Sequence, residues 1–362
     1  MRLLLRLLSI PLILIIGSCV QRDESYSNRF PDEEWEYESE LEAQGWDLAK
    51  LADLKTFVQD SSYTTGMMVI HNGKVVFEQG KIHDVSYIAS CRKSVLALLY
   101  GPFVENGKVD LSSTLEELQL DDVDGLLPIE KKATVANLLT SRSGVYHPAS
   151  NPGDQLSLAP ERGSVEPGTV WLYNNWDFNA AGFILESLTH KSVYDLIDSM
   201  LARPLKMRDW NKSIQQKSGN GSSLYPAYHM WFSTDDMARI GYLVLREGNW
   251  QGEQIISKEW IRKIVTPVTT YKEALANKRN MAHFGYGYMW WSWDSPDNSW
   301  PYNGWYTAMG AFGQYITVLP EIDLVVVHKN NSMTTETPVD TYLKILRKVT
   351  SAKDFENDGF YK

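Results

Sequence analysis

The segment that decides the fold and the chemistry of this chain is Ser90-Cys91-Arg92-Lys93, which opens the apolar stretch Ser94 to Tyr100. Positions i and i+3 share one face of a helix, so the Lys93 amine can lie against the Ser90 hydroxyl. A lysine with a lowered pKa can take the serine proton and make the hydroxyl a nucleophile. At a helix start, the Ser90 N–H is also free to form half of an oxyanion hole. The same letters also fit an ordinary N-cap serine followed by a solvated lysine, because short motifs often match by chance.

A second motif, Tyr173-Asn174-Asn175, precedes an amphipathic segment from Phe178 to Leu188. A tyrosine and an asparagine two positions apart at a helix start can point into one cleft. There the Tyr173 phenol would exchange protons with the nucleophile, and the Asn175 amide would orient the substrate or Lys93. The pattern is weak alone, because Tyr26-Ser27-Asn28 has it too.

A third segment near the C-terminus, Thr307 to Gln314, carries glycines into an alternating run from Tyr315 to Leu319. Glycine at the entry to a strand lets another backbone or a ligand approach closely. Gly310 is therefore predicted to border the substrate site, and the N–H of Ala311 is predicted to be the second oxyanion donor.

The order of these three motifs resembles the serine β-lactamase and penicillin-binding-protein superfamily, and within it the branch of class C β-lactamases, esterases and related amide hydrolases. Further segments are similar to those of the family: Leu138 to Gly144, Ser233 to Arg239, Phe284 to Trp290 and Pro320 to Val327. The resemblance implies an α/β (α+β) fold of the β-lactamase/transpeptidase type, in which an antiparallel sheet flanked by helices carries an inserted, mostly helical lobe. It also implies a hydrolase that needs no cofactor or metal, with Ser90 in the cleft between the lobes.

The third motif departs from the family pattern. β-Lactamases and transpeptidases carry Lys-Thr-Gly or a His-x-Gly variant there, whereas this chain has Ala308-Met309-Gly310. The cation that binds a substrate carboxylate through a strong charge-assisted bond is therefore missing. This favours a carboxylesterase or amidase over a β-lactamase, unless a cation such as Arg142 or His147 substitutes.

We therefore predict a serine hydrolase that acts on ester or amide bonds of a small molecule or peptide through a covalent acyl-Ser90 intermediate, with Lys93 and Tyr173 as the base. One alternative is a β-lactamase or D,D-peptidase that acts on cell-wall peptides. Another is a non-catalytic lipoprotein that uses the fold for binding. The intact Ser90, Lys93 and Tyr173 argue against the latter, because a binding module does not need all three.

The pattern of apolar residues predicts a sheet built from both ends of the chain. Asn72-Gly73 between two β-rich runs is a strong hairpin signal, and Tyr315 to Leu319 pairs naturally with Leu324 to His328. Helices are predicted at Ser94 to Glu105, Val135 to Thr140, Phe178 to Leu188, Val193 to Leu201, Asp235 to Arg246, Lys258 to Ile264 and Val339 to Val349. We place the α/β lobe at about 41–89 and 280–362, and the helical lobe at about 90–279.

The N-terminus is typical of a bacterial lipoprotein. Residues 1–18 have two arginines before a short apolar stretch, as in a signal peptide, and the following Cys19 completes a lipobox-like sequence. A plain signal peptide with a chance cysteine is the alternative. Residues 19–40 are acidic and are predicted to be a solvated tether to a domain at 41–362. We expect a lipid-anchored protein at the bacterial cell envelope, with its catalytic domain in the periplasm or on the extracellular face.

Composition excludes several other classes. The net charge of −10 argues against nucleic acid as a partner. With Cys19 assigned to lipid, Cys91 has no disulfide partner and is expected to be a small buried residue. The seven histidines show no metal-ligand spacing, so no metal is predicted.

The aromatic residues between Trp290 and Tyr306 fit either a substrate site or a packed hairpin. The oligomeric state stays open.

Overall fold

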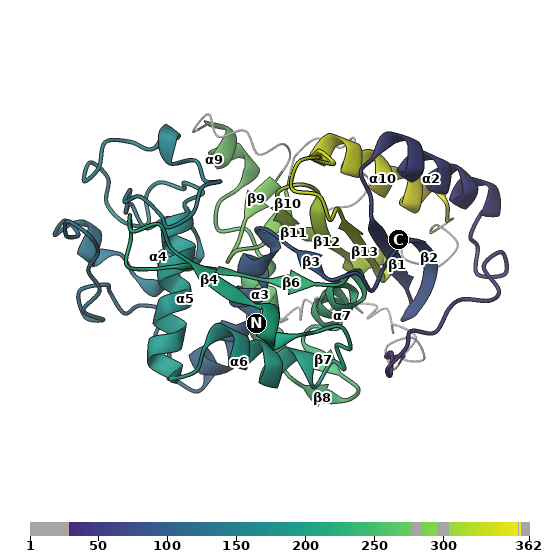
Figure 1. The fold of residues 1–362 in the computed structure, drawn as a ribbon, viewed down its shortest axis with the longest axis horizontal. Helices are drawn as coiled ribbons and strands as arrows, with labels where there is room; N and C mark the ends of the chain where they lie inside the picture. The colour runs from purple at the N-terminus through teal and green to yellow at the C-terminus, as the bar shows by residue number, and fades with distance from the viewer. Residues whose placement is uncertain (1–28, 277–283, 295–303, 354, 356–362) are drawn as a thin grey trace, which may run out of the picture.

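A computed structural model of the chain describes residues 29–276, 284–294, 304–353 and 355 (Figure 1). A seven-stranded sheet dominates this part, in the order β2-β1-β13-β12-β11-β10-β9, and all neighbouring strands are antiparallel. The strands are β1 (Gly66–His71), β2 (Lys74–Gly80), β9 (Phe284–Tyr286), β10 (Trp291–Trp293), β11 (Tyr306–Gly310), β12 (Gln314–Leu319) and β13 (Leu324–Lys329). Because β1 pairs with β13, the two ends of the chain form one sheet, which confirms the predicted architecture.

The predicted hairpin consists of β1 and β2, and β2 is an edge strand of the sheet. Asn72 and Gly73 connect β1 to β2 with φ of 50° and 79°. Two consecutive positive φ angles are what a two-residue type I′ hairpin turn requires, and Asn-Gly is its preferred sequence. Gly73 is also needed for space, because a Cβ there would lie 2.7 Å from the Arg29 carbonyl oxygen.

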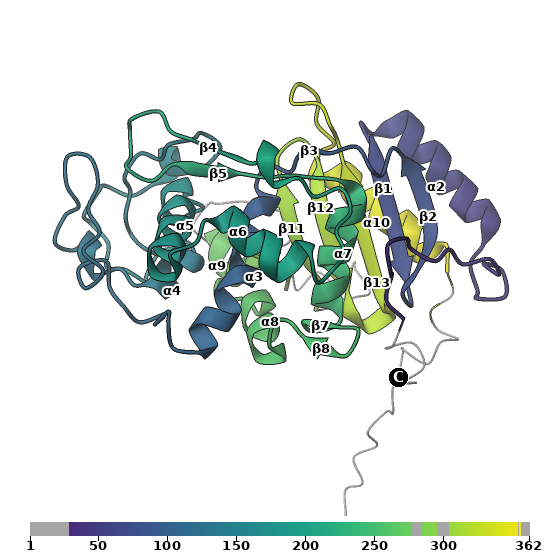
Figure 2. The same ribbon diagram turned by 60° about the horizontal axis from the view of Figure 1, so that its bottom comes forward.

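Helices cover both faces of the sheet. Helix α10 (Val339–Ser351), with α2 (Leu48–Ser61) beside it, lies on one face, and α7 (Thr234–Leu245) lies on the opposite face (Figures 1 and 2). Helix α3 (Cys91–Glu105) starts next to the sheet, where the Cys91 thiol donates to the Gln314 carbonyl. Cys91 is fully buried, as predicted. The sheet is thus the central layer of the α/β lobe.

The helical lobe follows α3 in the chain and lies beside the sheet (Figure 1). Its helices are α4 (Val135–Leu139), α5 (Asn175–Thr189), α6 (Val193–Ile197), α8 (Lys258–Val265) and α9 (Tyr271–Ala276). The described residues also contain three small antiparallel ribbons, namely β3 (Ser86–Tyr87) with β6 (Trp231–Phe232), β4 (Gln216–Ser218) with β5 (Ala227–His229), and β7 (Asn249–Trp250) with β8 (Glu253–Gln254).

Two predicted boundaries need correction. Helix α7 falls inside the predicted helical lobe at 90–279, yet it packs on the sheet, because the small Gly241 lets it approach Ile316 and Val325. The second half of the predicted tether is part of the folded domain. Its Trp35 is buried, and the Arg239 guanidinium donates to the backbone carbonyls of residues 32 and 33. Burial of an aromatic side chain of this acidic segment against apolar surface stabilises its contact with the domain.

The predicted signal peptide, Cys19 and the first part of the tether lie outside the described residues. Within the described ranges, none of the helices combines the length and apolar character that a membrane span requires.

The close packing of α7 on the sheet predicts a strong size limit at Gly241. A Cβ there would lie 2.7 Å from Val325 Cγ1 and 2.8 Å from Ile316 Cγ2. Replacing Gly241 with leucine overpacks this contact and should lower the free energy of unfolding by about 3 kcal/mol. Urea denaturation measures the effect. Gly219→Leu is the matched control, because the nearest atom to a Cβ there is 4.0 Å away; an equal loss in both variants would contradict the packing argument.

Candidate active site

Ser90 lies at the start of α3, directly after the β3 ribbon. Ala89, just before it, has φ of 48°, a conformation that is unfavourable for a residue with a Cβ. The Ser90 side chain makes no capping bond to the first turn of α3, and its Oγ accepts a hydrogen bond from Lys93 Nζ at 3.0 Å. Lys93 is only 2% exposed. The alternative interpretation, an N-cap serine followed by a solvated lysine, is therefore wrong.

The Lys93 amine joins Ser90 to Tyr173. Its Nζ lies 2.6 Å from the Tyr173 hydroxyl and 4.3 Å and 4.6 Å from the ring centroids of Tyr173 and Phe178. Burial, and then the positive charge of Arg92, lower the pKa of Lys93 well below its ordinary value. Both effects favour the neutral amine, which has a lone pair that can accept a proton.

Tyr173 is held by aromatic packing and lies just before α5. Its ring stacks on Trp291 at 5.5 Å and lies 5.0 Å from the Phe178 ring. Burial raises the pKa of Tyr173, and a hydrogen bond with Ser90 opposes that shift. The phenol is thus protonated at neutral pH and lies next to both Ser90 and Lys93. The fold brings together all three residues that the sequence predicted to be catalytic.

A turn from the predicted family segment at 138–144 fixes the position of Tyr173. Ser141 Oγ donates to the Leu172 carbonyl at 2.7 Å and accepts from the Asn174 backbone N–H at 3.3 Å. Ser143 Oγ donates to the buried Asp177 carboxyl at 2.6 Å, and burial raises the pKa of Asp177 well above its ordinary value. Sequence reasoning missed these positioning residues, although their similarity to a family segment was a usable signal.

Gly310 lies where strand β11 meets the nucleophile. A Cβ at this position would lie 2.6 Å from the Ile88 carbonyl oxygen and 3.0 Å from the Ser90 backbone nitrogen. Only a glycine allows this approach, as predicted for a ligand- or backbone-contacting strand. Ala311 follows in the exposed turn between β11 and β12, one residue beyond this contact.

Asn175 supports a loop at the edge of the site. Its Nδ2 donates to the Pro152 carbonyl at 2.8 Å, and its backbone N–H donates to an Asp154 carboxylate oxygen at 3.3 Å. Among the described residues, its side chain makes no hydrogen bond to Lys93, and its buried Oδ1 has no partner. The donors of Asn175 thus hold the loop at residues 152–154, and the predicted contact of its side chain with a substrate stays a prediction.

Neither proposed substitute for the missing cation is available. Arg142 pairs with Glu273 at 2.7 Å and donates to the Gly168 carbonyl. Both ring nitrogens of the buried His147 lie within 3.0 Å of backbone carbonyls. The third motif supplies only the buried Ala308 and the half-buried Met309.

The described aromatic residues near the third motif belong mainly to the core. Trp290, Trp291, Trp293 and Trp305 are each at most 5% exposed. This agrees with the packed-hairpin interpretation for these residues, while Trp300 and Tyr302 lie outside the described residues. Trp291 also has a direct link to the site, because it stacks on Tyr173.

Fold and site together place the chain in the serine β-lactamase and penicillin-binding-protein superfamily. The chain belongs to the beta-lactamase family, whose sequence model matches residues 52–348. An uncharacterised protein of Alkalihalophilus pseudofirmus is 23% identical over 303 residues, which are 74% of this chain and 83% of that protein.

Solved structures share the fold at low sequence identity. A candidate 6-aminohexanoate-dimer hydrolase from Bacillus anthracis superposes with a TM-score of 0.63 and 17% identity, over 93% of this chain and 91% of the other. A class C beta-lactamase gives 0.61 and 17%, over 84% and 95%. EstCE1, a hydrolase with promiscuous acyltransferase activity, gives 0.60 and 15%, over 83% and 98%. The family and the fold support a hydrolase, as predicted.

The buried amine predicts a pH-dependent gain in stability when Lys93 is replaced by methionine. The pKa of Lys93 is lowered in the folded state, whereas a lysine in the unfolded chain keeps a pKa of about 10.4. Below that pH the unfolded state binds more protons, so Lys93 destabilises the fold, and this penalty fades as the pH rises toward about 10.

Lys93→Met should therefore raise the free energy of unfolding most near neutral pH, and the difference from the original protein should shrink as the pH rises. Denaturant titrations over this pH range measure it, with the exposed Lys108→Met as the control. A difference that stays constant with pH would contradict a desolvated Lys93.

Proposed function

We propose that the protein is a serine hydrolase of ester or amide bonds that lack a neighbouring carboxylate, and that it works through an acyl-Ser90 intermediate. The observation that carries this proposal is the buried Lys93 amine, which hydrogen-bonds both the Ser90 hydroxyl and the Tyr173 phenol. A solvated surface motif has no reason to bury a lysine among aromatic rings. Burial of a lysine is expected in an enzyme that uses a neutral amine as a base, because burial lowers the pKa of the amine.

In the first half of the proposed reaction, Ser90 Oγ forms a bond to the substrate carbonyl carbon. Its proton passes to the neutral Lys93 amine, directly or through the Tyr173 hydroxyl. The carbonyl oxygen becomes an oxyanion held by the Ser90 and Ala311 N–H groups, and each such donor lowers the barrier by about 3 kcal/mol. As the intermediate collapses, the bond to the alcohol or amine breaks, and the leaving group takes the proton from Tyr173 or Lys93.

In the second half, a water molecule attacks the acyl carbon and gives its proton to the same pair. The ester bond to Ser90 breaks, Oγ regains a proton, and a carboxylic acid leaves. No step needs a metal or cofactor, since the Lys93–Tyr173 pair carries every proton.

The charge of the site supports the preference for uncharged substrates. Ala308 and Met309 replace the cationic part of the third motif, while Arg142 and His147 are engaged elsewhere. A charge-assisted bond to a carboxylate is worth about 1.5–3 kcal/mol. A penicillin or a D-Ala-D-Ala peptide would forgo that binding energy, whereas a simple ester or amide would not.

The nucleophile assignment predicts selective labelling of Ser90. A fluorophosphonate probe should bond to Ser90 Oγ with loss of fluoride, and intact mass with peptide mapping would locate the adduct. Ser90→Ala should remove both the adduct and ester turnover, the latter by at least about 1,000-fold. Ser86→Ala is the matched control, because its hydroxyl donates to Asn331 outside the Lys93–Tyr173 pair. Labelling that persists in Ser90→Ala would refute the assignment.

The missing cation predicts the substrate class. A short p-nitrophenyl ester should acylate the enzyme at least about tenfold to a hundredfold more efficiently, in kcat/KM, than nitrocefin, which carries a carboxylate. Faster nitrocefin turnover, or a stable penicilloyl adduct, would favour the β-lactamase or D,D-peptidase alternative. No adduct with either class would favour the non-catalytic binding protein.

A further inference from the structure

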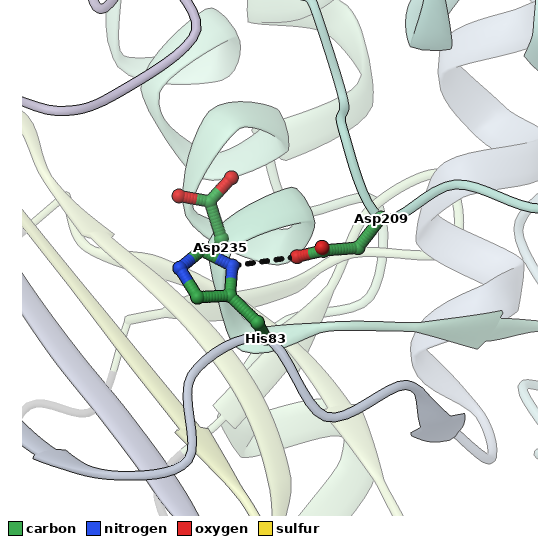
Figure 3. A group of neighbouring side chains, drawn as sticks. All are labelled: His83, Asp209 and Asp235. Carbon is green, nitrogen blue, oxygen red and sulfur yellow. Dashed lines mark hydrogen bonds and ion pairs between the residues drawn. The ribbon is translucent and has the colours of Figure 1, made fainter.

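Outside the active site, three side chains from distant parts of the sequence converge. His83 lies between β2 and β3, Asp209 lies in the loop before β4, and Asp235 is in the first turn of α7 (Figure 3). One potential ligand atom from each residue lies within 4.8 Å of the other two. His83 Nδ1 is 2.8 Å from an Asp209 carboxylate oxygen. The wide sequence spacing explains why a motif search does not find this group.

We propose that His83, Asp209 and Asp235 form a binding site for a divalent transition-metal ion, with Zn²⁺ as its test ion. One imidazole nitrogen and two carboxylate oxygens are a donor set that suits such ions, and the imidazole favours them over Ca²⁺ or Mg²⁺. The ion would be structural, because none of its three ligands belongs to the Ser90–Lys93–Tyr173 group. The inference stands independently of the proposed hydrolase activity.

The distance between His83 and Asp209 is close to the one that an ion requires, and a ligand atom of Asp235 lies within 4.8 Å of both. Two donors that each lie about 2.1 Å from one zinc ion, at tetrahedral or right angles, are about 3.0–3.4 Å apart. The 2.8 Å separation between His83 and Asp209 needs to open by only a few tenths of an ångström. The side chains of His83 and Asp209 are 39% and 16% exposed, so an ion can enter, while Asp235 at 3% forms the floor of the site.

A neighbouring buried residue, Asp236, adds a third acidic group to the cluster. Asp236 is 0% exposed, no side chain among the described residues donates a hydrogen bond to its carboxyl group, and the Asp209 backbone N–H is the group that offers it one. Asp209 and Asp235 are the carboxylates that act on it most strongly. Three acidic groups thus lie close together around His83, and a divalent ion bound by Asp209 and Asp235 would reduce the repulsion between them.

The cationic side chains near the cluster leave room for an ion. Arg239 donates to one oxygen of Asp235 at 2.9 Å, so the second oxygen of that carboxylate can bind a metal. Arg208 lies 4.0 Å from Asp209 but also pairs with Glu34. Lys329 donates to the Phe232 backbone carbonyl. These cations balance part of the acidic charge, and the imidazole supplies a neutral third ligand.

The position of the site gives it a structural consequence. The backbone N–H groups of Thr234 and Asp235 both donate to the Ile82 carbonyl, next to His83. An ion held by all three ligands would fasten the segment that leads to Ser90 both to α7 and to the loop at Asp209. We expect binding to raise the melting temperature, because the ion binds the folded chain far better than the unfolded one.

The test uses the full chain, purified without an affinity tag. After equilibrium dialysis against Zn²⁺ and removal of weakly bound ions, elemental mass spectrometry should find one zinc more per chain than in His83→Gln or Asp209→Asn. Zinc should raise the melting temperature of the original protein and not that of these variants. Ca²⁺ should do neither.

The control is His190→Asn, which removes a different exposed histidine and keeps a residue that tolerates the left-handed φ of 57° at that position. It should retain the zinc and the thermal shift. Circular dichroism without zinc identifies any variant that fails to fold. If His83→Gln fails to fold, the zinc content of Asp209→Asn, which keeps the side-chain shape, decides whether the site exists. Equal zinc retention in all variants, or none in the original protein, would overturn the proposal and leave His83–Asp209 as an ordinary ion pair.

Discussion

The burial of one amine, that of Lys93, is the constraint on which the rest of the site depends. An ammonium group loses hydration when it is enclosed, so the enclosure favours the neutral amine. The rings of Tyr173 and Phe178 lie over the amine, and Tyr173 in turn stacks on Trp291, which lies on the strand β10 more than a hundred residues away in the sequence. The sheet and the helical lobe must therefore close on each other before Lys93 acquires its unusual pKa. The chemistry of the motif is a property of the whole fold.

Backbone geometry imposes a second requirement. Ala89 and Ser141 have φ of 48° and 59°, which costs of order 1–3 kcal/mol each for residues with a side chain. The first lies next to Ser90, and the second belongs to the turn that holds Tyr173. Gly310 then allows the strand β11 to lie against the Ser90 backbone. The surrounding hydrogen bonds and packing hold Ala89 and Ser141 in these conformations. The free energy of those contacts therefore offsets the conformational strain of the two residues.

Much of this arrangement could be predicted from the sequence, because its signals are local. The Asn72-Gly73 turn, the alternating strand pair after Gln314, and the helix from Cys91 follow from period and turn chemistry. Helix α2 was not among the predicted helices, although Leu51, Leu54 and Val58 show the spacing of one buried helix face. The packing of α7 on the sheet and of the residues around Trp35 on the domain could not be predicted, because both depend on tertiary contacts. His83, Asp209 and Asp235 converge only in three dimensions.

The site also separates two roles that a positive charge can have in this superfamily. One role is to hold a substrate carboxylate, and the other is to keep the catalytic lysine neutral. In this chain Arg92 lowers the pKa of Lys93 from within α3, where its guanidinium lies 4.3 Å over the Tyr228 ring and donates to Asn179. This cation is buried behind the site and does not depend on the third motif. Ala308 in place of the third-motif lysine therefore leaves in place the charge that acts on Lys93. Under the proposed function, the Ser90–Lys93–Tyr173 group can thus be retained while recognition shifts from carboxylate-bearing amides to uncharged esters and amides.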